Sequence, residues 1–288
     1  MSKYELLRQR VAEETEIELL VPDAATNEEL LLCHSEEYVR RVVEGQMEAD
    51  EQRELGFPWS EQMVERSRRS VGATIAAART ALDEGAAANL AGGTHHAKYD
   101  RAQGFCVFND CAVAARLMQH EDLADQILIV DADVHQGNGT AEICVGDKSI
   151  YTFSIHGEKN FPTQKAKSDL DIEVEDGIVD EPYLDAFDQG LSVALNESYP
   201  DLVFYLAGAD PFEGDKLGRL KLSKAGLAQR DQMVMDYCAR RSLPLVMVMA
   251  GGYAAEVNDI VDIHFASLKI LAEYERRIRL EAEAVSFQ

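Results

Sequence analysis

Apolar residues recur along the chain at two spacings, which predict helices alternating with strands. The clearest helix covers residues 60–83, where Ser60 can cap the first turn and apolar residues recur at helical spacing at Met63, Val71, Ile75, Ala78 and Leu82. Other helices are predicted over residues 3–14, 35–45, 109–120, 181–196, 224–240 and 255–275. We therefore expect a single α/β domain over residues 1–288, with a mostly parallel sheet and helices on both faces.

Five short apolar runs, each followed by polar residues, predict the strands of this sheet. They cover residues 87–90, 127–130, 150–153, 202–206 and 245–249. The polar residues that follow include His95, the segment 131–135, Ser154, Asp210 and Tyr253. Ligands of open α/β sheets bind at the carboxyl ends of the strands. We expect these five strand ends to meet at one edge of the sheet.

The composition narrows the class of protein. With 288 residues, 46% of them hydrophobic, the chain can build one large core. It has no apolar stretch of membrane-spanning length and no apolar signal region at its start. Its five cysteines are scattered and form no CxxC pair, which is typical of reduced, buried thiols. These features predict a cytoplasmic protein that does not span a membrane.

The formal net charge of −24 argues against direct binding of nucleic-acid backbones, which requires a basic surface. It favours a cationic substrate in the long-range field. Acidity that serves only solubility explains the charge better than substrate attraction does. The oligomeric state cannot be inferred from the sequence.

The segment Asp131-x-Asp133-x-His135 carries side chains that can bind a metal. Alternate residues of an extended segment face the same way, and carboxylates with an imidazole suit a divalent cation. Asp210, from another strand end, would complete a three-residue site with open positions, as in catalytic metal sites. Zn²⁺ is the first choice, and Fe²⁺ or Mn²⁺ is also compatible. The alternative, that Asp131 and Asp133 only cap the next turn, weakens beside four other polar strand ends.

Three further residues could carry acid–base chemistry. One of the adjacent His95 and His96 could be a general base and the other could stabilise developing charge. Asp131 and Asn138 could fix their tautomers. Tyr253, after two glycines, could donate a hydrogen bond to an oxyanion. The alternatives are a hydrogen-bonded loop pair for the histidines and an ordinary turn for the tyrosine.

Two aromatic residues and one serine complete the set of candidates. Phe105 and Phe161 could form the walls of a narrow apolar slot, although ordinary core positions explain them about equally well. Ser154, with the chain beside it, could join Asp131 in a site for a monovalent cation. Spacing alone does not decide either point.

Five motifs follow one another along the chain: Gly92-Gly93-Thr94-His95-His96-Ala97, Gly104-Phe105-Cys106-Val107-Phe108-Asn109-Asp110, Asp131-Ala132-Asp133-Val134-His135-Gln136-Gly137-Asn138-Gly139, Gly208-Ala209-Asp210 and Gly251-Gly252-Tyr253. In this order they resemble the histone deacetylase superfamily, which has an arginase-like fold, and the resemblance runs from about Glu28 to Ala272. The segment 56–60 and the pair Gln136 and Asn138 resemble the bacterial members nearest to class IV.

The resemblance implies roles for individual residues. The zinc ligands would be Asp133, His135 and Asp210. His96 would act as general base and then as general acid, with Asn138 as its partner. His95, paired with Asp131, would be its electrostatic neighbour, and Tyr253 would polarise the acyl carbonyl. The substrate tunnel would include Phe105, Phe161, Gly104 and Gly252. A buried potassium site would be formed by Asp131, Asp133, His135, Ser154 and Ile155.

The chain departs from the family pattern in two places. Many members have an aspartate where Asn138 stands, and a neutral partner should lower the pKa of His96 relative to those members. The strand that usually comes first in the family is expected to be missing, because the sequence begins at the helix predicted for residues 3–14.

The resemblance predicts a zinc-dependent amidohydrolase that removes an acetyl or other acyl group from an acylated lysine or a small acylated amine. A ureohydrolase with two metal ions, which shares the fold, is the alternative enzyme. A non-catalytic protein that binds acyl ligands is the alternative outside enzymes.

Overall fold

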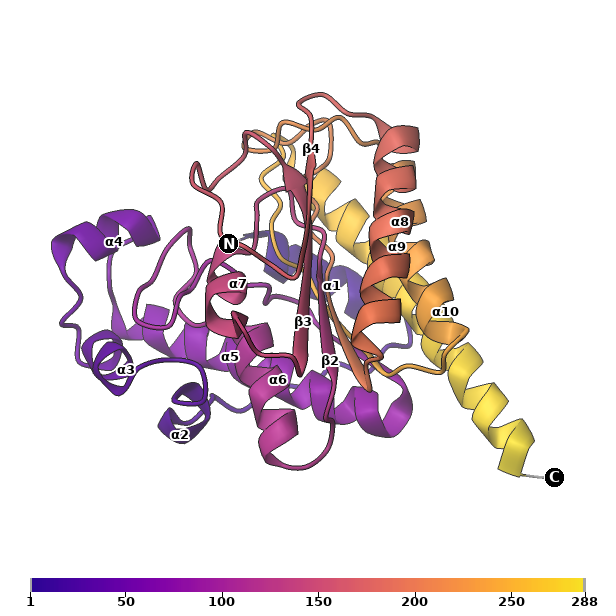
Figure 1. The fold of residues 1–288 in the computed structure, drawn as a ribbon, viewed down its shortest axis with the longest axis horizontal. Helices are drawn as coiled ribbons and strands as arrows, with labels where there is room; N and C mark the ends of the chain where they lie inside the picture. The colour runs from indigo at the N-terminus through magenta and orange to yellow at the C-terminus, as the bar shows by residue number, and fades with distance from the viewer. Residues whose placement is uncertain (1, 287–288) are drawn as a thin grey trace.

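A sheet of six parallel strands lies at the centre of the computed structural model, which describes residues 2–286 (Figure 1). The strands follow the order β1-β6-β5-β2-β3-β4, and every neighbouring pair is parallel. Their bounds are β1 (Ala86–Asn89), β2 (Ile127–Asp131), β3 (Ile150–Gly157), β4 (Leu170–Val174), β5 (Leu202–Leu206) and β6 (Leu245–Val248). The α/β fold with a parallel sheet, as predicted from the sequence, is confirmed.

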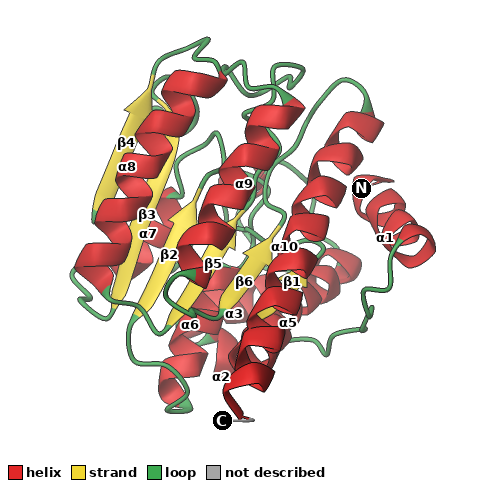
Figure 2. Cartoon of the chain, turned by 90° about the vertical axis from the view of Figure 1, so that its right-hand side faces the viewer, coloured by secondary structure: helices red, strands yellow, loops and turns green. Residues whose placement is uncertain are grey.

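Helices cover both faces of the sheet. On one face lie α8 (Asp180–Ser198), α9 (Lys224–Ala239) and α10 (Val257–Ser286), with α1 (Ser2–Glu14) packed against α10 (Figure 2). The opposite face carries α5 (Glu61–Glu84), α6 (Asp110–His120) and α7 (Asn138–Cys144). Outside this second layer lie three short helices, α2 (Asn27–Leu30), α3 (Glu36–Val43) and α4 (Ala49–Leu55).

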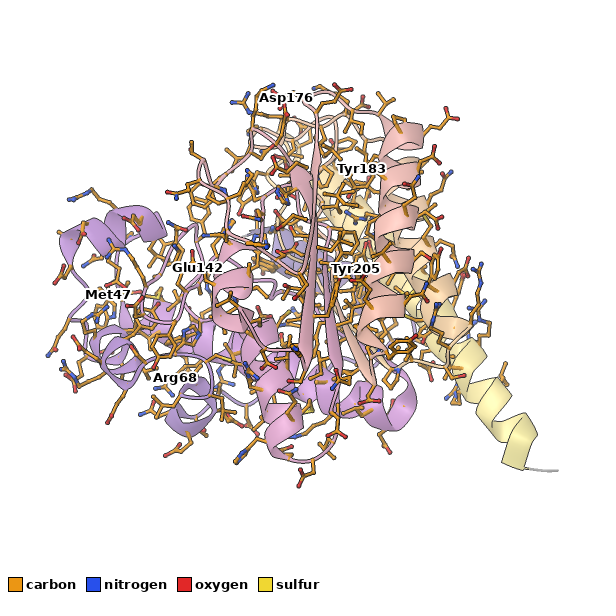
Figure 3. All side chains as sticks on the ribbon, in the orientation of Figure 1. Met47, Arg68, Glu142, Asp176, Tyr183 and Tyr205 are labelled. Atoms are coloured by element: carbon orange, nitrogen blue, oxygen red, sulfur yellow. The ribbon has the colours of Figure 1, made fainter. Side chains whose placement is uncertain are left out.

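Strand residues alternate between two hydrophobic cores, one on each side of the sheet. Leu128 and Val130 of β2 belong to the core beneath α8, α9 and α10, whereas Ile127 and Ile129 belong to the core beneath α5 and α6. Tyr183 of α8 and Tyr205 of β5, both labelled in Figure 3, belong to the core beneath α8, α9 and α10. Because both faces are buried, the strands are almost entirely apolar, and this is why they can be recognised in the sequence.

The sequence prediction was incomplete for β3 and β4. β3 continues to Gly157, so Ser154 and His156 lie within the strand and do not follow it. β4 was not predicted, because this edge strand alternates half-buried Leu170 and Ile172 with the acidic Asp171 and Glu173. Such a short run with charged residues resembles a loop when only the sequence is considered.

The first described strand, β1, lies at an edge of the sheet, paired with β6. Both α5 and α10 pack against it. The helix predicted for residues 3–14 is present as α1, and its Leu7 and Val11 are buried in the core.

Two predictions made from composition, on the cysteines and on membrane-spanning segments, can be compared with the structure. All five cysteines are free and buried, as predicted. Within residues 2–286, no helix is both long enough and apolar enough to cross a membrane.

Candidate metal centre and active site

Three side chains converge at the carboxyl ends of β2 and β5. Asp133 and His135 follow β2, Asp210 follows β5, and their potential ligand atoms all lie within 4.8 Å of one another. Asp133 is 1% exposed and Asp210 is 0% exposed, while His135 is half-buried. Nδ1 of His135 lies 3.0 Å from Oδ1 of Asp133 and 3.3 Å from Oδ2 of Asp210. These three residues form the metal cluster.

The chemistry of the metal cluster fits a divalent cation. Burial, followed by the negative charge of Asp133, raises the pKa of Asp210 to about 7. Burial disfavours a charged His135, but the two carboxylates raise its pKa to about 10. Oδ2 of Asp210 makes no hydrogen bond with any described residue, so it is available as a ligand. A cation would compensate the two buried carboxylates, and this donor set suits Zn²⁺ and is compatible with Fe²⁺.

Backbone amides hold both carboxylates in place. The amide of Gly251 donates to Oδ2 of Asp133 at 2.7 Å, and the amide of Val134 donates to Oδ1 of Asp210 at 2.9 Å. A Cβ atom at Gly251 would lie 1.9 Å from Oδ2 of Asp210 and 2.5 Å from Oδ2 of Asp133. Glycine is required at position 251 because no side chain fits between the carboxylates and the backbone.

The two adjacent histidines contact different partners. Nδ1 of His95 lies 2.6 Å from Oδ2 of Asp131, and Nδ1 of His96 lies 2.7 Å from Oδ1 of Asn138. The amide nitrogen of Asn138 donates to Gln103 at 2.8 Å, so its carbonyl oxygen faces His96. His96 therefore donates through Nδ1 and keeps Nε2 free to exchange a proton.

The pKa values of these histidines move in opposite directions. Burial lowers the pKa of His95, but Asp131 and then Asp133 more than compensate and raise it to about 9. Burial also lowers the pKa of His96, and the positive charges of His95 and His135 lower it further, to well below its usual range. At neutral pH the pair therefore combines a cationic His95 with a neutral His96, which can accept a proton.

Replacing Asn138 with aspartate is expected to raise the pKa of His96, because a carboxylate stabilises the imidazolium. Activity that requires neutral His96 is lost as the pH falls below this pKa. In the pH profile of kcat/KM, the midpoint of the acidic limb should therefore move to a higher pH by about one to two units. The measurement is a pH profile of kcat/KM, with the exposed Asn196→Asp as the matched control. An unchanged acid limb in Asn138→Asp would show that His96 does not control it.

The loop that carries the histidines is held by Asp110, the last residue of the motif 104–110, for which no role was predicted. The Asp110 carboxylate accepts hydrogen bonds from the amides of Gly93 and Thr94 at 3.1 and 2.7 Å, and from the hydroxyl of Thr74 at 2.6 Å. Asn109 caps α6 and donates to the carbonyl oxygen of Ala97. The signal available in the sequence was the pair of polar residues at the start of the helix predicted for residues 109–120.

Two exposed aromatic rings flank the histidines. Phe105 is 47% exposed and Phe161 is 40% exposed, so neither is an ordinary core residue. The ring centre of Phe161 lies 4.9 Å from that of His96, and the ring centre of Phe105 lies 6.0 Å from that of Tyr253. A Cβ atom at Gly104 would lie 2.5 Å from Cδ2 of His96. Both partly exposed rings thus lie beside candidate acid–base residues.

Tyr253 is half-buried in the turn that follows β6. Its backbone amide donates to Asp215 at 2.6 Å. Lys3 of α1 donates to the carbonyl oxygen of Gly252 at 3.2 Å, and its Nζ lies 5.4 Å from the centre of the tyrosine ring. Burial, and then the charge of Asp133, raises the pKa of the Tyr253 phenol. The hydroxyl therefore stays protonated and can donate a hydrogen bond.

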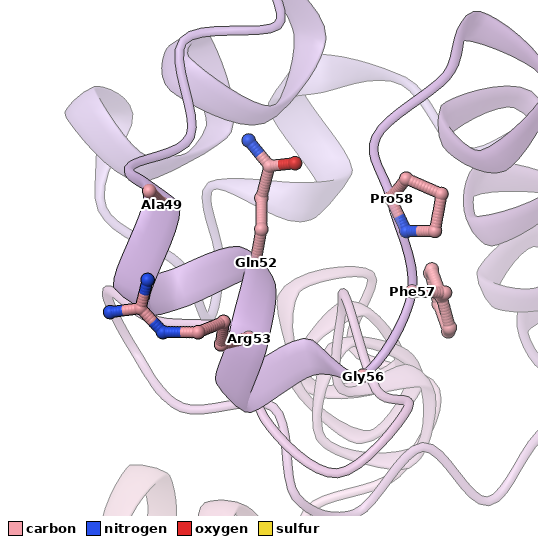
Figure 4. Close-up of a pocket in the computed structure, with 6 residues that line it drawn as sticks. All are labelled: Ala49, Gln52, Arg53, Gly56, Phe57 and Pro58. Atoms are coloured by element: carbon pink, nitrogen blue, oxygen red, sulfur yellow. The ribbon is translucent and has the colours of Figure 1, made fainter.

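A pocket of about 460 Å³ lies between α4 and the segment that follows it (Figure 4). It contains none of the candidate metal or acid–base residues, and we do not assign the chemistry to it. Its Phe57 stacks on the tunnel candidate Phe105 with ring centres 6.3 Å apart, so the pocket lies beside that ring. The lining residues are Ala49, Gln52, Arg53, Gly56, Phe57 and Pro58.

The residues of the expected potassium site lie on the adjacent strands β2 and β3 and in the segment that follows β2. Asp131 and Ser154 are register partners in the β2–β3 ladder, and both are buried. The hydroxyl of Ser154 lies 2.9 Å from Nδ1 of His156. Ile155 is fully buried within β3.

Comparisons with known proteins identify relatives among the histone deacetylases. The family model of the histone deacetylase domain matches residues 2–268. An uncharacterized protein of Picosynechococcus sp. is 42% identical over 92% of this chain and 89% of its own length. Histone deacetylase 2 of Arabidopsis thaliana and histone deacetylase clr6 of Schizosaccharomyces pombe are each 32% identical over 82% of this chain, which spans only 63% and 62% of their lengths. The crystal structure of the HDA15 HD domain superposes on this chain with a TM-score of 0.79 and 25% sequence identity. The match covers 97% of this chain and 89% of the chain in that structure.

Proposed function

The chain belongs to the histone deacetylase family, a family of deacetylase hydrolases, and from this premise we propose that it is a zinc-dependent amidohydrolase. The proposed reaction removes an acetyl or other acyl group from an acylated lysine or a small acylated amine. The observation that carries the proposal is the convergence of Asp133, His135 and Asp210 within 4.8 Å of one another. The names of the histone deacetylase relatives support the substrate class.

In this proposal the metal cluster holds the zinc ion, with Asp133, His135 and Asp210 as ligands. When bound, zinc would lower the pKa of water and polarise the acyl carbonyl. The buried carboxylates and the unbonded Oδ2 of Asp210 support this assignment.

His96 moves the proton in the proposed reaction. Its Nε2 removes a proton from the attacking water and later delivers it to the leaving amine. Asn138 keeps the ring oriented through Nδ1, at 2.7 Å, without adding charge. The cationic His95, fixed by Asp131, provides positive charge beside the reacting carbonyl.

Tyr253 stabilises the tetrahedral oxyanion through its hydroxyl. We assign the flanking rings, Phe105 and Phe161, to the walls of a tunnel for the acyl-amine chain, with Gly104 and Gly252 providing space. The exposure of both rings supports this role. A potassium ion would bind on the β3 side of the metal cluster, through Asp131, Asp133, His135, Ser154 and Ile155. The adjacency of Asp131 and Ser154 in the ladder supports that site.

A substrate panel tests the proposal. Acyl-lysine peptides and acylated polyamines of different acyl length are incubated with the purified chain, with zinc and with a chelator. We expect release of the acyl group by protein containing one zinc per chain, loss of turnover with the chelator, and recovery after zinc is restored. The net charge of −24 favours cationic amines within the panel and argues against nucleic acid as a partner.

Each alternative predicts a different result in the same experiment. Two metal ions per chain, with hydrolysis of a guanidino compound, would favour a ureohydrolase. Tight binding of acyl-lysine without turnover would favour a non-catalytic binding protein. The cytoplasmic location predicted from composition is a separate expectation, which fractionation of cells would test.

A further inference from the structure

A buried arginine lies behind the metal cluster, on the face of the sheet that α9 covers. Arg230 is 0% exposed and is the largest fully buried side chain among the described residues. Its Nη1 donates to the carbonyl oxygens of Ala132 and Gly208, at 3.1 and 2.8 Å. Ala132 directly precedes Asp133, and Gly208 stands two residues before Asp210. One guanidinium nitrogen thus bridges the two segments that carry the carboxylates of the metal cluster.

This bridge lies where the β2–β5 ladder ends. The last register pair of the ladder is Asp131 with Leu206, and just beyond it the amide of Ala132 donates to the carbonyl oxygen of Leu206 at 3.2 Å. The segments remain close, since a Cβ atom at Gly208 would lie 2.8 Å from Cα of Asp133. Arg230 therefore links the segments beyond the point where strand pairing holds them together.

The guanidinium is itself held in a fixed orientation by its neighbour in sequence. Oδ1 of Asp231 accepts from Nε and Nη2 of Arg230 at 3.0 and 2.8 Å. The Asp231 carboxylate also accepts from the hydroxyl of Tyr205 in β5, which is labelled in Figure 3, and from the hydroxyl of Ser267 in α10. The network joins three elements, and a fully bonded buried network of this kind is rigid.

Stability alone is a poor explanation for this ion pair. Burying two charges carries a large desolvation cost, and apolar replacements of buried ion pairs are often neutral or stabilising. What apolar side chains cannot supply is the pair of hydrogen bonds to Ala132 and Gly208. We propose that Arg230, held by Asp231, is a positioning residue that sets the separation of Asp133 and Asp210 for the metal ion. This inference rests on the zinc site of the proposed function.

Zinc affinity tests this role without relying on activity. The dissociation constant is measured by competition with a chromophoric chelator for the wild type, Arg230→Met and Arg230→Lys. We expect Arg230→Met to weaken zinc binding by roughly ten- to a hundredfold, as is typical for residues that orient metal ligands. Arg230→Lys, which can still donate to a carbonyl oxygen, should recover part of the affinity.

The matched control is Leu195→Ala. Leu195 is 2% exposed in the same hydrophobic core but stands near the end of α8, just before β5 begins, and therefore at the opposite end of the strands from the metal cluster. We expect it to lower the melting temperature without changing zinc affinity. The rise in melting temperature on adding zinc should shrink in Arg230→Met but not in Leu195→Ala.

Milder variants keep the test decisive if Arg230→Met does not fold. Tyr205→Phe and Ser267→Ala each remove one hydrogen bond to Asp231, and each should weaken zinc binding several-fold. Wild-type zinc affinity in the folded Arg230 variants, or in both milder variants, would overturn the positioning role and leave the proposed function intact. If the wild type itself bound no zinc, the proposed function would fail and the positioning role would fail with it.

Discussion

Replacing Tyr253 with phenylalanine is expected to lower kcat about a hundred- to a thousandfold, the usual effect of removing one oxyanion donor. The substitution removes only the hydroxyl, so the ring contact with Phe105 and the Lys3 contacts with the turn can persist. The raised pKa of Tyr253 keeps the phenol protonated, and the loss therefore reflects a missing hydrogen-bond donor. The zinc content should not change, because Tyr253 is not a ligand.

Steady-state kinetics and metal analysis of the same preparation provide the measurement. The loss should appear mainly in kcat, since the oxyanion forms only along the reaction path. Tyr199→Phe is the matched control, because Tyr199 is 79% exposed and stands just before β5 begins, at the opposite end of the strands from the metal cluster. Near-normal turnover of Tyr253→Phe would contradict the assignment of this tyrosine as the oxyanion donor.

Replacing Asp210 with asparagine is expected to remove bound zinc and, with it, turnover. The amide oxygen can still accept from the amide of Val134, so the local backbone should be retained. What is lost is one of the two buried charges that attract the cation. Because burial and the charge of Asp133 raise the pKa of Asp210 to about 7, ionised Asp210 destabilises the metal-free fold at higher pH. The metal-free variant should therefore be at least as stable as the metal-free wild type.

Two readouts separate these effects. Zinc per chain after dialysis reports metal binding, and thermal unfolding in chelator at pH 8 reports the stability of the metal-free fold. Asp83→Asn, which changes an exposed carboxylate, should leave both values near those of the wild type. If Asp210→Asn retained one zinc per chain, Asp210 could not be a required ligand.

Much of the fold could be predicted because buried strands and buried helix faces appear as apolar patterns in the sequence. The strand at residues 127–130 is fully apolar because it is covered on both faces, and Ser60 caps α5 by accepting from the amide of Met63, as predicted. The convergence of strand ends follows from parallel pairing alone. Parallel pairing therefore predicted that Asp133, His135 and Asp210 lie close together, as they do.

Other features depend on contacts between residues distant in sequence. Arg230 lies in α9, a helix without a clear apolar face in its sequence, and a charged residue there is normally assigned to solvent. Arg230 donates to the carbonyl oxygen of Ala132, 98 residues earlier in the chain, and to that of Gly208, 22 residues earlier, and its partner Asp231 accepts from Ser267 of α10. The bond from Asn138 to Gln103 spans 35 positions. Local patterns carry no information about such pairings, so this part of the site required the structure.

The absent side chain at Gly251 has a consequence for surveys of genomes. A search that scores relatives only by the aspartates and histidine of the metal cluster would accept a chain with alanine at this position. A methyl group there would overlap both carboxylates, at 1.9 and 2.5 Å, and the ligands could not adopt their positions. A sequence that retains all three ligand residues can therefore still lack a site that binds the metal ion. Scoring this glycine as a fourth diagnostic position would separate competent relatives from those that only retain the motif.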